Sequence, residues 1–294
     1  MQKSGANVVF VDESVFPQTL AVVTTRAIPQ GIQIRTGKYG ETELTPDTFA
    51  CIVQYPNAGG NIEDYRAFVE KAHAADCKVA VAADILSLAL LTPPGEWGAD
   101  IVFGTTQRLG TPMFYGGPSA AYFATRDEYK RNMPGRIIGW SKDKYGKLCY
   151  RMALQTREQH IKREKATSNI CTAQALLATM AGFYAVYHGP EGIRTIAGRI
   201  HSIAAFLEQE INKLGYRQMN AQYFDTLRFA LPDNVSAQQV RTVALSKEVN
   251  LRYFKNGDVG MSIDETTDLA AVNVLLSIFG IAAGKDYTLS LIHI

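Results

Sequence analysis

Hydrophobic residues in the first part of the chain alternate between short strand-like runs and stretches with helical spacing. The 78–83 run, KVAVAA, is almost wholly apolar, as expected for a strand covered on both faces of a parallel sheet. A helix is predicted for 14–26, with Pro17 near its start, and another for 61–76, where apolar residues recur every three or four positions. Further strand-like runs stand at 8–11, 31–35, 49–54, 99–104 and 119–124. This order predicts an α/β fold with a mostly parallel sheet.

The pattern changes in the last third of the chain. A strong helical pattern over 170–187 ends at Gly189-Pro190, and a second long amphipathic helix is predicted for 193–214. Shorter strands and helices follow, with Asn256-Gly257 as a hairpin turn. We therefore predict a large α/β domain over 1–189, a small C-terminal α+β domain over 190–285, and a tail of different character over 286–294. The strands and the final helix of the small domain are predicted at 225–231, 251–254, 260–263 and 269–279.

Composition narrows the class of protein. The chain has 294 residues, 47% of them hydrophobic, and a formal net charge of +2, which is typical of a globular protein. Its apolar runs are far shorter than the ~18 residues of a membrane span, and its start lacks the apolar core of a secretory signal. Because the four cysteines form no CxxC pair, we expect no zinc site. Cys51 and Cys77 lie within apolar strand- or helix-like patterns, which predicts buried thiols, and the cysteines as a whole favour a cytoplasmic protein.

Charge is concentrated in one stretch. Residues 126–165 contain 12 Lys and Arg but 5 Asp and Glu, together with Trp140, Tyr145 and Tyr150. A long segment of this kind is more often functional or interfacial than idle. A nucleic-acid surface is the less favoured alternative, since no binding module or domain-wide basicity accompanies it.

Three segments are candidates for a binding or catalytic site, because ligands in such folds bind at the carboxyl ends of strands. They are the turn at 55–60, Asp84 after the apolar strand, and the glycine-rich loop at 104–117. That loop lacks both GxGxxG and GxxxxGK[ST], so it forms either a phosphate cradle or structural turns. A fourth candidate is 157–169, where Thr167, Ser168 or Asn169 starts a helix beside basic residues. This segment is either an anion site or a capped helix with a solvated basic face.

Three strings resemble the N-terminal half of the glycine cleavage system P-protein. They are GADIVFGTTQRLGTPMFYGGPSAAYFATR, MPGRIIGWSKD and YRMALQTREQHIKREKATSNICTAQALLA, with a weaker likeness from DESVFPQTL to the helix near Phe279. The resemblance implies a fold-type I pyridoxal-phosphate architecture. It also implies a reaction in which glycine is decarboxylated and its aminomethyl group passes to the lipoyl arm of the H-protein. A catalytic C-terminal half or second subunit, and an oligomer, are the implied partners.

The same resemblance assigns two cofactor-site positions. Asp84 matches the aspartate that holds the pyridine nitrogen, and Gln107-Arg108 stands where the catalytic half has a His-Lys pair. A guanidinium stays protonated and does not condense with an aldehyde as a lysine amine does. We therefore expect no covalently bound pyridoxal phosphate on this chain, and a role in supporting a catalytic half. The alternatives are a non-catalytic scaffold, or another fold-type I enzyme, which the missing Ser-x-x-Lys and His-Lys signatures disfavour.

The REKATSN string supplies a rival lysine, Lys165, which precedes a helix rather than following the expected strand. We expect it to bind an anionic group or the partner rather than to hold the cofactor. The candidate substrate or interface residues are Arg157, His160, Arg163, Lys165, Thr167, Ser168 and Asn169. Because the family has a substantial region ahead of the first strand, we also expect this sequence to be a fragment.

Overall fold

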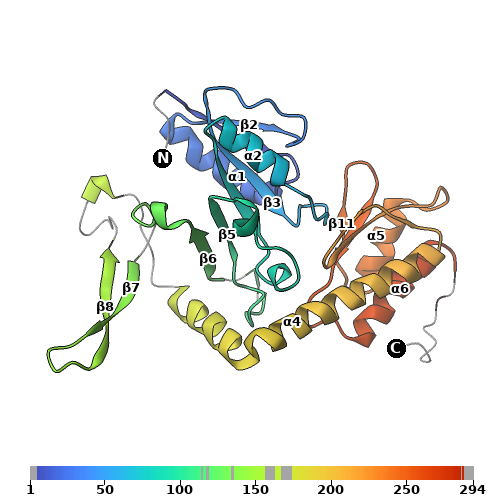
Figure 1. Ribbon diagram of the computed structural model, residues 1–294. Coiled ribbons are helices and arrows are strands. Elements are labelled where there is room, and N and C mark those ends of the chain that lie inside the picture. The colour runs from blue at the N-terminus through green and yellow to red at the C-terminus, as the bar shows by residue number, and fades with distance from the viewer. Residues whose placement is uncertain are drawn as a thin grey trace.

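The computed structural model describes residues 5–113, 115–116, 119–133, 136–155, 163–166, 174–285 and 287. The first part of the chain forms a six-stranded sheet (Figure 1). Its spatial order is β2-β1-β3-β4-β5-β6. The first five of these pair in parallel, and β6 pairs antiparallel with β5. This confirms the mostly parallel α/β class. The strands are β1 (Val8–Asp12), β2 (Gln33–Gly37), β3 (Thr48–Tyr55), β4 (Lys78–Ala83), β5 (Ile101–Thr105) and β6 (Ala121–Thr125).

Two helices cover opposite faces of this sheet. Alternate residues of β1 point to opposite sides: Val9 and Val11 pack with residues of α1 (Pro17–Ala27), whereas Phe10 packs against Phe68 of α2 (Arg66–Ala74). Every residue of β1 is buried. The buried strands therefore follow from near-continuous apolar runs, and the helices from their three- and four-residue spacing.

The helix predicted over 61–76 is shorter in the structure, and its predicted start was wrong. Asn61 instead forms an isolated antiparallel bridge with Tyr223, and its backbone N–H donates to Asn57 Oδ1 at 3.0 Å. The chain turns into α2 at Arg66 and leaves it after Ala74. These hydrogen bonds stabilise an extended segment where helical spacing of apolar residues alone predicted another turn of helix.

A four-stranded antiparallel sheet forms the second core, in the order β11-β12-β10-β9. Its strands are β9 (Arg217–Gln218), β10 (Thr226–Ala230), β11 (Arg252–Tyr253) and β12 (Val259–Ser262). Helices α5 (Ala237–Ser246) and α6 (Leu269–Ala282) pack with it, around fully buried side chains that include Leu227, Phe229 and Phe279. Gly257, with φ +91°, makes the predicted hairpin turn. The small α+β unit of the predicted fold class is confirmed.

The long helix α4 (Ala175–Lys213) joins the two sheets (Figure 1). It bends at Gly189, whose φ of 62° and ψ of −179° lie outside the helical region, immediately before Pro190. The predicted break between the two helices is therefore confirmed at this bend, where Gly189 is not helical and Pro190 lacks a backbone N–H to donate. The predicted start at 170 lies outside the described residues. The domain boundary placed at this bend stays a prediction.

Strands β7 (Arg136–Lys142) and β8 (Leu148–Gln155) form a separate hairpin within the basic stretch. Figure 1 shows this hairpin (green) projecting away from both sheets. These two strands were not among those predicted from the sequence.

The thiols of Cys51 and Cys77 are both fully buried, as predicted. In the part of the chain that the structure describes, no helix combines the length and apolar character needed to cross a bilayer.

Candidate functional site

Asp84 and Arg108 meet at the carboxyl ends of β4 and β5. Each residue follows its strand, so the parallel register brings the two side chains to one edge of the sheet. Arg108 Nε and Nη2 donate to the same oxygen of Asp84, Oδ2, at 3.1 Å and 2.7 Å. The other oxygen, Oδ1, accepts the backbone N–H of Leu86 at 2.9 Å. Both carboxylate oxygens of Asp84 are therefore already engaged by the protein.

Asp225, just before β10, supplies a second carboxylate to the same arginine. Its Oδ2 accepts a hydrogen bond from Arg108 Nη2, and its side chain is 7% exposed. The guanidinium also lies 5.9 Å from the centre of the Phe224 ring. Arg108 thus bridges a carboxylate of the parallel sheet and a carboxylate of the small antiparallel sheet. We call Asp84, Arg108 and Asp225 the bridging cluster.

The strand ends next to Asp84 are packed too closely for a larger residue at Gly104. A Cβ built on Gly104 would lie 2.3 Å from the carbonyl oxygen of Ala83. The Tyr122 hydroxyl donates to that same carbonyl at 2.8 Å. Burial raises the pKa of Tyr122 above its usual range, and the nearby charge of Asp84 raises it further. Tyr122 therefore stays a neutral hydrogen-bond donor in the physiological pH range.

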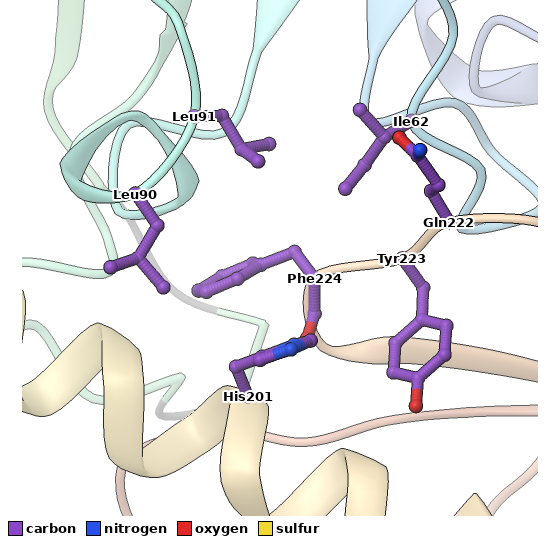
Figure 2. A pocket seen from close by; sticks show the side chains of 7 residues that line it. All are labelled: Ile62, Leu90, Leu91, His201, Gln222, Tyr223 and Phe224. Carbon is purple, nitrogen blue, oxygen red and sulfur yellow. The ribbon is translucent and has the colours of Figure 1, made fainter.

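A largely apolar cavity lies beside the bridging cluster. It has a volume of about 440 Å³ and is lined in part by Phe224, whose ring lies near the Arg108 guanidinium. Figure 2 shows Leu90 and Leu91 facing His201 and Phe224 across this space. His201 is held by a 2.9 Å hydrogen bond between its Nδ1 and the Phe224 carbonyl. The remaining lining residues are Ile62, Gln222 and Tyr223.

Backbone contacts fix the junction between the two sheets near this cavity. The N–H of Ile62 donates to the Gln222 carbonyl at 3.0 Å. Asn220 Nδ2 donates to the Gly59 carbonyl at 2.7 Å, and Arg252 donates to the Ala58 carbonyl. Because the turn after β3 is tied to the small sheet in this way, the bridging cluster sits in a fixed frame.

Sequence analysis named two of the three cluster residues. The structure brings Asp84 and Arg108 together, and their assignment as counterparts of cofactor-site residues stays a prediction. The third cluster residue, Asp225, was not predicted, because it lies 117 positions beyond Arg108 and no local sequence pattern marks it. No motif connects such distant residues, and only the packing of the two sheets does.

The predicted substrate or interface segment falls mostly outside the described residues, which do not include Arg157, His160, Thr167, Ser168 and Asn169. Arg163 is exposed and begins the short turn Arg163–Lys165, with a φ of 50°. The glycine-rich loop at 104–117 is also partly outside the described residues. Both sites stay predictions.

The chain matches the family model for the glycine cleavage system P-protein over residues 1–279. It is 84% identical over 286 residues to a glycine dehydrogenase (decarboxylating) of Bacteroides fragilis, covering 97% of this chain and 30% of that protein. A protein of the same name from Flavobacterium johnsoniae is 52% identical over 285 residues, with the same coverage. The chain therefore spans about a third of the length of the curated relatives it matches.

Solved structures share the fold. A crystal structure of glycine decarboxylase (P-protein) in inhibitor-bound form superposes with a TM-score of 0.84 at 31% identity, covering 94% of this chain and 65% of that one. The cysteine desulfurase CsdA from Escherichia coli has a TM-score of 0.65 at 14% identity over 97% of this chain and 73% of its own, a likeness of fold alone. The architecture is that of the fold-type I pyridoxal-phosphate enzymes. On the match of 279 residues, the chain belongs to the glycine cleavage system P-protein family.

Proposed function

We propose that this chain is a non-catalytic part of a pyridoxal-phosphate-dependent glycine decarboxylase and supports a catalytic partner half. The single observation that carries the proposal is Arg108, which stands where the resemblance places the cofactor lysine and which pairs with Asp84 and Asp225. Family membership supports the glycine-cleaving activity of the whole assembly.

The residues at the bridging cluster do not fit pyridoxal phosphate. A protonated pyridine nitrogen needs a free carboxylate oxygen, yet Asp84 Oδ2 accepts two hydrogen bonds from Arg108, and Oδ1 accepts one from Leu86. The guanidinium would also repel a pyridinium cation, and it does not condense with an aldehyde. We therefore derive no catalytic step at this cluster.

The remaining parts of the proposal concern the assembly. Glycine and the lipoylated H-protein are its substrate and partner, and the catalytic half holds the cofactor. The buried thiols of Cys51 and Cys77, which are not joined in a disulfide, fit a cytoplasmic location. A second candidate function is a purely structural scaffold. The bridging cluster favours this second function because Arg108 connects the two sheets through Asp84 and Asp225.

Borohydride reduction of the whole, cofactor-loaded P-protein tests the proposal. Reduction fixes lysine-bound pyridoxal phosphate, and mass spectrometry of the peptides then locates the label. We expect the label on a lysine outside residues 1–294, because Arg108 is not able to form the bond. The absorbance of the bound cofactor before reduction serves as the loading control. A pyridoxyl group on any lysine of this chain, Lys165 included, would refute the proposal.

The segment at 157–169 is proposed as a contact for an anionic group or for the partner. Reversing two of its charges with Arg163→Glu and Lys165→Glu should weaken assembly or lower glycine turnover, because like charges would then repel the bound group. Size-exclusion chromatography and the glycine exchange rate are the measurements. Arg26→Glu with Lys255→Glu, at two exposed cations elsewhere, is the matched control. Unchanged assembly and turnover in the first variant would remove this role.

A further inference from the structure

The β7–β8 hairpin carries a row of large apolar side chains on one face. In its register Trp140 lies opposite Tyr150, and Ile138 lies opposite Met152, so that their side chains share one side of the pair. Their exposed fractions are 72% and 74% for the first pair, and 56% and 42% for the second. Leu148 is on the same side and is 67% exposed. We call these five residues the hairpin face.

This face is poorly suited to remain in water. The Trp140 and Tyr150 rings contact each other edge to face at 5.8 Å, yet both stay largely exposed. A two-stranded sheet is marginally stable by itself and needs a third strand or a packed layer. Tryptophan, tyrosine and methionine are also the residues enriched at protein interfaces. The hairpin is thus built to be covered by another protein surface.

The surroundings of the hairpin face indicate the charge of what covers it. Residues 136–155 contain five Lys and Arg and a single acidic residue, Asp143. Lys142, Lys147 and Arg151 are all exposed. Lys142 lies opposite Leu148 in the register and therefore on the side of the hairpin face, so two copies meeting face to face would bring their Lys142 side chains into one interface, and such like-charge contacts are unfavourable. The chemistry fits a partner with an apolar patch edged by carboxylates.

We propose that the hairpin face binds the part of the P-protein that lies outside residues 1–294. The curated relatives support this occupant because this chain covers 30% of their length, which leaves most of such a protein to supply the covering surface. The proposal rests on the proposed function, since it assigns the surface through which this chain contacts the catalytic half.

Site-specific photo-cross-linking in the whole P-protein tests the contact. A benzophenone amino acid at Tyr150 should cross-link to a peptide outside residues 1–294, which mass spectrometry identifies. The same probe at Val22, a 57% exposed residue of α1 away from the hairpin, is the control for random capture. A cross-link to residues within 1–294, as two packed copies would give, overturns the proposal, as does a yield no higher than that of the control.

A second variant measures whether the aromatic residues carry the contact. With the probe at Met152, Trp140→Ser should lower the cross-link yield several-fold, because large aromatic side chains dominate interface energies. Val22→Ser should leave the yield unchanged. An unchanged yield in Trp140→Ser would show that the hairpin face is not the contact. The cofactor-labelling experiment fails or succeeds independently, because it reports where pyridoxal phosphate is bound and not which surface is covered.

Discussion

Replacing Arg108 with alanine should lower the free energy of unfolding by on the order of 3 kcal/mol, because two partly or fully buried carboxylates would lose their shared cation. The side chains of Arg108, Asp84 and Asp225 are 21%, 22% and 7% exposed. Removing the guanidinium leaves Asp225 with little solvent to replace it. Urea denaturation followed by circular dichroism measures the change.

The substitution Arg108→Lys distinguishes the contribution of the positive charge from that of the hydrogen-bond geometry. Arg108→Lys keeps the positive charge but offers a single nitrogen in place of the planar fork that reaches both Asp84 and Asp225. We expect a loss of stability smaller than that of Arg108→Ala. If the ion pairs are the cause, Arg108→Ala should also cost less in an Asp84→Asn, Asp225→Asn background, because no buried charge is then left unpaired. A loss below about 0.5 kcal/mol in Arg108→Ala would show that the bridging cluster contributes nothing to folding.

Under the proposed function, Arg108 would replace the cofactor as the charge partner of Asp84. In the proposed function, Asp84 has lost its cofactor partner, and an unpaired buried carboxylate is unfavourable. Arg108 supplies a permanent cation to Asp84 and extends the pairing to Asp225. Arg108 therefore connects the parallel sheet to the small antiparallel sheet through these two ion pairs.

The main elements of the fold were predictable from local pattern. The strand at 78–83 agrees with β4 residue for residue, since a continuous apolar run between turn residues has few alternatives. The turn at Asn256-Gly257 was equally clear, because few sequences accept a positive φ at that place. Asp84 and Arg108 were identified by the family resemblance rather than by pattern.

What the sequence did not reveal depends on contacts between distant segments. Asn61 begins no helix because it forms a bridge with Tyr223, which lies between β9 and β10, more than 150 positions along the chain. Asp225 looks in the sequence like any polar residue at the start of a strand, and its pairing with Arg108 arises only because the fold brings the two residues together. The β7–β8 hairpin was missed although Leu148, Tyr150 and Met152 recur at every second position, because the Lys, Arg and Gly residues of this stretch are typical of a loop.

Substituting Gly60 with alanine should destabilise the junction between the sheets by roughly 3 kcal/mol. Gly60 has a φ of +91°, and a Cβ there would lie 2.4 Å from the Thr226 carbonyl oxygen and 3.0 Å from Asn220 Nδ2. A positive φ costs a non-glycine residue roughly 1–2 kcal/mol, and overpacking adds about 1–3 kcal/mol. Because the obstacle is backbone, the turn after β3 and the start of β10 have to move apart.

Gly257 provides a control that isolates the clash from the backbone strain. It has the same φ of +91°, but a Cβ built there meets no atom within 4 Å. Gly257→Ala should therefore cost only the roughly 1–2 kcal/mol of the unfavourable φ. The difference between the two variants, measured by urea denaturation, is the steric contribution of the junction. Equal losses in Gly60→Ala and Gly257→Ala would mean that the two sheets approach less closely at Thr226 than the structure indicates, and that the frame around Arg108 is looser.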